Sequence, residues 1–166
     1  MKILLTIVAV ITLIIALGAS VVTFARVKKG AREMDKFETM LKQSESNKTL
    51  YKTLKAEQDK RGIASAGTYR TIGYVSLILA IGFLAFLVVT FLKNDKLRLI
   101  VAGSVLALNL ILVMMSPGGD YSESKYNSTP STRKIALITL GIGVVGIVTG
   151  LGRNKVGQKT QKEVAA

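Results

Sequence analysis

The segment Thr139–Gly152 contains three glycines, Gly141, Gly143 and Gly146, with the spacing G-x-G-x-x-G. In dinucleotide-binding proteins this spacing follows a strand and opens a helix beneath the pyrophosphate, and an acidic residue about 20 positions later holds the ribose. Here no strand–helix–strand pattern surrounds the glycines, and the only later acid, Glu163, lies in a basic segment. The glycines therefore do not predict a dinucleotide site.

A second nucleotide motif is nearly present just after the first, in the letters GRNKVGQKT. Gly152 and Gly157 have the spacing of a phosphate-binding loop, but Gln158 occupies the position that lysine must fill to reach the phosphates. The sequence therefore predicts no phosphate loop, and we expect no nucleotide binding.

The residue types that carry most enzyme chemistry are missing, because the chain has no histidine and no cysteine. Their absence removes thiolate nucleophiles, the usual zinc ligands and the commonest general base. The remaining acids, such as Glu33, Asp35 and Asp120, form no recognisable catalytic constellation. We therefore expect a protein that is not an enzyme and that needs no cofactor or metal.

Apolar residues are gathered in four runs that contain no charged residue, although the 166-residue chain has a net charge of +13. The runs cover residues 3–25, 71–92, 99–116 and 135–152 and have 23, 22, 18 and 18 residues. At about 1.5 Å per residue, even the shortest forms a helix of roughly 27 Å, close to the hydrocarbon thickness of a bilayer. A cleaved signal peptide is the alternative for the first run, but that run is longer than a typical signal core and ends without a clean cleavage site.

These runs predict an all-α integral membrane bundle of four transmembrane helices, with a basic extramembrane helical hairpin between the first and second spans. The expected organisation is transmembrane helix 1 over 1–25, the hairpin over 26–70, transmembrane helix 2 over 71–92, a tight basic turn over 93–98, transmembrane helix 3 over 99–116, a polar loop over 117–134, a glycine-rich transmembrane helix 4 over 135–152, and a basic flexible tail over 153–166.

Helical geometry explains the glycines of the fourth run better than nucleotide binding does. Gly143, Gly146 and Gly150 are three and four positions apart, so they share one face of a helix. In the third run, Gly103 and Ala107 are four apart. Helices in lipid associate by close backbone approach, which small residues allow. All five residues are therefore predicted to be helix-packing positions.

The apolar runs contain no ionisable residue, which argues against an ion-coupled transporter and against an intramembrane protease. Asn109 is the only carboxamide within them. It is predicted to make a polar contact between helices, and the alternative is that it lines the lumen of a pore.

The segment between the first two runs, residues 26–70, has twelve basic and six acidic residues. Arg26, Lys28, Lys29 and Arg32 come directly after the first run, where basic residues attract anionic lipid headgroups. They are candidates for docking lipid or a protein partner, and a solvated, salt-bridged connector is an equally weighted alternative. Nucleic acid is not expected as a partner, because acids are interleaved with the bases.

Charge also predicts orientation in the membrane, which we expect to be a bacterial inner (cytoplasmic) membrane. The basic turn Lys93–Arg98 favours a cytoplasmic position for itself and for both termini. The basic residues after the first run favour the opposite orientation, but long loops count for less.

Two functions compete. The first is a non-catalytic structural or assembly subunit that packs against partner membrane proteins. The alternative is a homo-oligomeric channel or uncoupled facilitator for ions or small solutes, with a lumen lined by Asn109, Ser104 and Thr139.

Overall fold

The computed structural model describes residues 2–92, 94–119 and 131–164, and all regular elements within these ranges are helical. The elements are α1 (Lys2–Gln43), the 3₁₀ turn η1 (Ser44–Ser46), α2 (Lys48–Arg61), α3 (Ala66–Phe91), α4 (Asp95–Met115) and α5 (Thr132–Val164). Four of them, α1, α3, α4 and α5, are long and apolar enough to cross a membrane. The prediction of an all-α chain with four helices of membrane-spanning length is confirmed.

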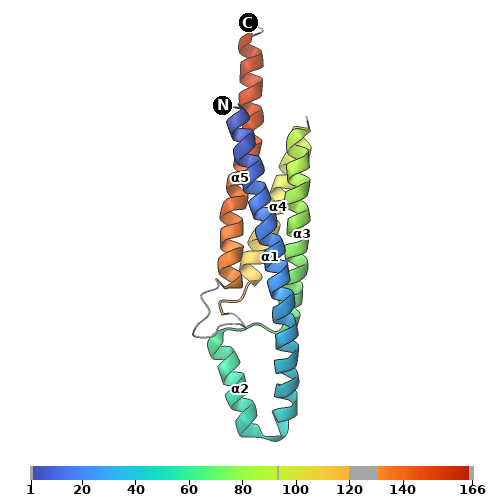
Figure 1. Cartoon of the computed structure of the whole chain (residues 1–166), viewed down its shortest axis with the longest axis vertical. Coiled ribbons are helices and arrows are strands. Elements are labelled where there is room, and N and C mark those ends of the chain that lie inside the picture. Colours follow the sequence, from blue (N-terminus) through green and yellow to red (C-terminus); the bar gives the residue numbers. More distant parts are fainter. Residues whose placement is uncertain (1, 93, 120–130, 165–166) are drawn as a thin grey trace.

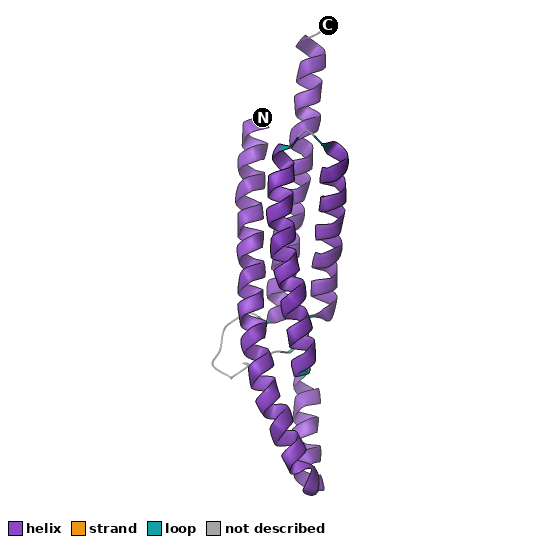
Figure 2. Cartoon of the chain, turned by 90° about the vertical axis from the view of Figure 1, so that its right-hand side faces the viewer, coloured by secondary structure: helices purple, strands orange, loops and turns teal. Residues whose placement is uncertain are grey.

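The four long helices form one bundle in which each runs antiparallel to its neighbours (Figure 1). α1 packs against α3 and α5, and α4 completes the ring by packing against the same two helices from the opposite side. The N-terminus and the C-terminal end of α5 lie at the same end of the bundle (Figures 1 and 2). The segment Gly141–Gly146, whose glycine spacing matches a dinucleotide-binding turn, lies in the middle of α5. It is therefore not a strand-to-helix turn.

α1 is much longer than a bilayer is thick. It has 42 residues, which at about 1.5 Å each correspond to roughly 63 Å, about twice the hydrocarbon thickness. Its second half, from Arg26 to Gln43, first lies beside the start of α3 and then extends beyond the bundle, where α2 runs back beside it (Figure 1). We call residues 26–43 the α1 extension. That this extension and α2 stand outside the membrane stays a prediction from their charge.

The turns on either side of α2 use residues whose chemistry suits helix ends. The Leu50 N–H donates to the Asn47 side chain at the start of α2, as expected for an N-cap. Gly62 ends the helix with φ +62, a left-handed conformation that glycine adopts without strain. Ser65 then accepts from the Thr68 N–H at 3.2 Å and starts α3.

The helices extend beyond the predicted spans at several ends. α3 begins at Ala66 rather than at residue 71, and α4 begins at Asp95 rather than at residue 99. α5 continues to Val164, through most of the segment that was expected to be a flexible tail. Lengthening an existing helix avoids the cost of nucleation, so residues 153–164 remain helical without an apolar run. The centre of the predicted polar loop, residues 120–130, lies outside the described residues.

The bundle presents large apolar side chains on its outer surface as well as in its core. Ile3 is 77 % exposed, Ile100 65 %, Met114 83 % and Val148 61 %. They come from α1, α4 and α5 and lie within the apolar runs. A soluble bundle would place polar residues there, so this surface fits a multi-span membrane protein whose solvent is lipid.

Two polar contacts connect the α1 extension to the start of α3. The Ala66 N–H donates to Glu38 Oε1 at 2.9 Å, so a carboxylate from α1 satisfies a backbone donor at the N-terminus of α3. One turn later, Arg70 Nη2 lies 2.6 Å from Asp35 Oδ2. These contacts fix the direction in which α3 leaves the turn.

Replacing Glu38 by alanine removes the acceptor of the Ala66 N–H. We expect E38A to lower the unfolding free energy in detergent by about 1 kcal/mol and to speed hydrogen exchange in the first turn of α3. E45A is the matched control, because the exposed Glu45 makes no hydrogen bond within the described residues. Equal effects of the two substitutions would contradict the stabilising role of the Glu38 contact with Ala66.

Candidate functional site

The glycines on one face of α5 leave room for bulky side chains of α1 and α3. A Cβ added to Gly143 would lie 2.7 Å from Phe83 Cζ of α3, and one added to Gly146 would lie 3.0 Å from Leu13 Cγ of α1. At Gly150 the nearest atom would be Phe86 Cε1, at 3.1 Å. Phe83, Phe86 and Leu13 are almost fully buried. A side chain at any of these three glycines therefore requires its neighbours to move.

The small residues of α4 occupy a different position. Gly103 and Ala107 are exposed on the outer face of the bundle, and a Cβ on Gly103 would meet no atom within 4 Å. α4 instead turns Ala102, Val105, Asn109 and Leu112 inward. Within this chain, Gly103 and Ala107 therefore do not bring helices together.

Asn109 lies fully buried at the junction of α3, α4 and α5. Its Nδ2 donates to the Thr139 carbonyl oxygen of α5 at 3.4 Å, and the same nitrogen would lie 3.2 Å from a Cβ on Gly143. Its Oδ1 has no hydrogen-bond partner among the described residues. Asn109 thus makes one long hydrogen bond between α4 and α5.

A close contact that the sequence patterns did not single out lies at Gly82 of α3. A Cβ there would lie 3.0 Å from Val105 Cγ2 of α4. Gly82 has one small residue on the same face, Ala85, three positions later. This pair is a weaker signal than the three glycines of the fourth run, and the three-dimensional arrangement identifies the contact.

The basic residues that follow the first apolar run point in different directions from α1. Arg26 is half-buried, whereas Lys28, Lys29 and Arg32 are exposed. Lys28 and Arg32 are one turn apart and lie in a groove between α1 and α3. The structure thus brings two of the four candidates together beside α3.

The carboxylates of the described residues form no group of three that could hold a metal ion. The acids whose side chains are described lie along the α1 extension, η1, α2 and the start of α4, and several of them are held in ion pairs or hydrogen bonds by their neighbours.

No protein-family model matches the chain, and no curated protein or solved structure matches it either.

The glycine contacts predict that substitution by alanine has different effects on stability at two positions of α5. We expect G146A to lower the midpoint of thermal unfolding in detergent, by an amount corresponding to about 1–3 kcal/mol, because the added methyl overfills the contact with Leu13. G141A is the matched control, since a Cβ there meets nothing within 4 Å. It should leave stability unchanged or slightly raised, because alanine is the better helix former. Equal losses in both variants would show that the contact is not tight.

The burial of Asn109 predicts that its volume matters more than its amide. N109L should change the unfolding free energy by less than about 1 kcal/mol, because hydrogen bonds between membrane helices are weak and the leucine removes an unpaired carbonyl oxygen. N109A should cost about 2 kcal/mol or more, since it leaves a cavity. Thermal unfolding in detergent measures both, and a large loss in N109L would show that the amide itself holds α4 to α5.

Proposed function

We propose that this chain is a non-catalytic structural or assembly subunit of a larger membrane complex. In this role its glycine-rich helix α5 holds the bundle together, while the outer face of α4 receives a partner membrane protein. The observation that carries the proposal is the exposure of Gly103 and Ala107 on α4, because small residues on a lipid-facing surface allow another helix to approach closely.

The positions of the polar residues within the spans support this proposal over a channel. Asn109 and Thr139 are fully buried within the bundle, whereas Ser104 is exposed on its outer face. The Ser104 hydroxyl donates to the Ile100 carbonyl oxygen of its own helix at 3.0 Å. The three residues therefore do not share a lumen within one chain.

For the membrane location we propose a bacterial inner membrane with both termini in the cytoplasm. The turn between α3 and α4 lies at the same end of the bundle as the termini (Figure 1). Its basic residues, together with the basic C-terminal part of α5, favour the cytoplasmic side by the positive-inside rule.

Purification from native membranes in mild detergent, followed by native mass spectrometry, tests the subunit role. We expect stoichiometric partner polypeptides to accompany the chain. The double variant G103V/A107V should stay folded. It should reduce the recovery of partners roughly tenfold, because the added methyl groups weaken the association of the helices by about 1.4 kcal/mol.

G141V is the matched control, because Gly141 is an equally open glycine on α5, and it should keep the partners bound. A ring of identical chains without other polypeptides, together with ion or solute flux in liposomes, would replace the subunit role with the channel. Equal loss of partners in both variants would show that α4 is not the contact face.

A further inference from the structure

A groove lies between α1 and α3 at the end of the bundle from which the α1 extension leaves. It encloses about 400 Å³ and is lined by Phe24, Lys28 and Arg32 of α1 and by Arg70, Gly73 and Tyr74 of α3, among others. A second hollow of about 680 Å³ shares Phe24, Lys28 and Arg32 and continues along α1 as far as Lys36. The groove therefore combines aromatic walls with a row of cations.

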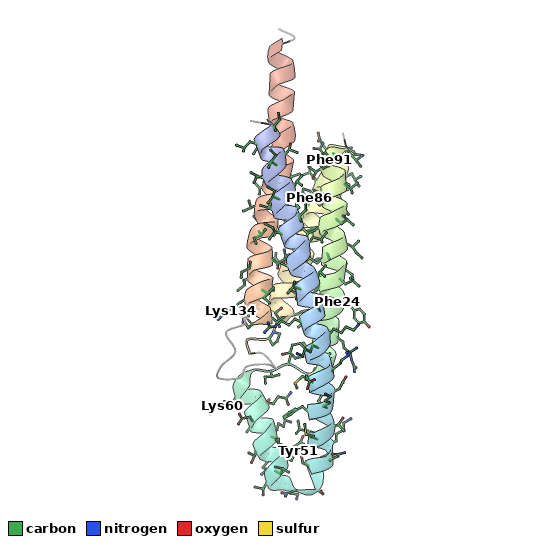
Figure 3. The ribbon with its side chains drawn as sticks, viewed as in Figure 1. Phe24, Tyr51, Lys60, Phe86, Phe91 and Lys134 are labelled. Carbon is green, nitrogen blue, oxygen red and sulfur yellow. The ribbon has the colours of Figure 1, made fainter. Side chains whose placement is uncertain are left out.

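The level of this groove coincides with the boundary between apolar and charged sequence. The apolar run of α1 ends directly before Arg26, and that of α3 begins directly after Arg70. Phe24 on α1 and Lys134 at the start of α5 lie at nearly the same level along the bundle (Figure 3). The groove thus reaches from about one turn inside the apolar zone on α3 to about three turns beyond it on α1, and so crosses the depth at which lipid headgroups lie.

The charges in the groove are only partly compensated by the chain. Asp35 is the one carboxylate that lines the groove itself, and it is held by Arg70 at 2.6 Å. Glu33, which lines the adjoining hollow, is paired with Lys36 at 3.3 Å. Lys28 lies 6.0 Å from the centre of the Phe24 ring. Within the described residues, neither Lys28 nor Arg32 makes an ion pair with a carboxylate. Two exposed cations on one face thus remain available to an anion.

The apolar side of the groove suits a ligand with hydrocarbon tails. Tyr74 is 64 % exposed, as is common for tyrosine at a membrane interface. Further into the apolar zone, Val21 of α1 is 47 % exposed and Leu77 of α3 is 42 % exposed. Each lies three positions from Phe24 or Tyr74 along its helix, so they continue the same faces toward the centre of the bundle.

We propose that this groove binds one anionic phospholipid, with its phosphate between Lys28 and Arg32 and its acyl chains against the exposed apolar side chains of α1 and α3. Arginine and lysine are the donors that phosphate oxygens prefer, and the hydrocarbon contacts distinguish a lipid from a free phosphate ion. This site is independent of the proposed subunit role and does not require a partner protein.

Native mass spectrometry of the full chain in a neutral detergent tests the site. Phosphatidylglycerol is titrated against phosphatidylcholine with the same acyl chains, and we expect the first to bind more tightly. The variant K28Q/R32Q should weaken phosphatidylglycerol binding roughly thirtyfold, since each basic residue near the membrane surface contributes a factor of about five in affinity. The charge-preserving variant K28R/R32K should keep most of the binding.

The matched control is K48Q/K52Q, which removes from α2 two exposed lysines that lie one turn apart. This variant should leave phosphatidylglycerol binding unchanged. Equal weakening in both glutamine variants would replace the groove with a diffuse attraction to basic surface, and an unchanged K28Q/R32Q would remove the site.

A titration with inorganic phosphate alone tests whether the bound anion is a lipid headgroup or a free phosphate ion. We expect no retained phosphate, because the ion lacks the hydrocarbon contacts. Phosphate that binds as tightly as the lipid would overturn the lipid assignment, as would a co-purified polypeptide that is lost specifically from K28Q/R32Q.

Discussion

Helices surrounded by lipid must satisfy their own polar groups, and this constraint governs the structure. The hydroxyl of Ser20 donates to the carbonyl oxygen of Ala16, that of Ser76 to Ile72 and that of Thr90 to Phe86, each four residues earlier in the same helix. Thr12, Thr23, Ser116 and Thr139 follow the same pattern. Such side chains leave few polar groups to connect one helix with another.

The helices are therefore held together mainly by the steric fit of their surfaces. Tight fits occur where a glycine faces a bulky buried residue of another helix, as at Gly143 with Phe83 and at Gly82 with Val105. Association without a hydrophobic drive depends on such complementary surfaces. The long hydrogen bond of Asn109 to the Thr139 carbonyl oxygen lies beside this tight fit at Gly143.

The sequence predicted the helical class and the four spans, because charge-free runs of this length are typical of helices that cross a bilayer. It also excluded a nucleotide site at Gly141–Gly146, which lies in mid-helix. It could not predict which face of α4 points inward. A helix in lipid is apolar on all sides, so the periodicity that marks the outside of a soluble helix is missing. Gly103 and Ala107 were therefore predicted as packing positions, although they face outward in this chain.

The unbroken length of α1 has a mechanical consequence. The helix has no proline and runs continuously from the protruding extension to its contact with Gly146 inside the bundle. A helix transmits tilt and rotation along its axis, whereas a loop absorbs them. A molecule bound at the far end of the extension would therefore act on a rigid rod that passes Gly146 and continues to the opposite end of the bundle.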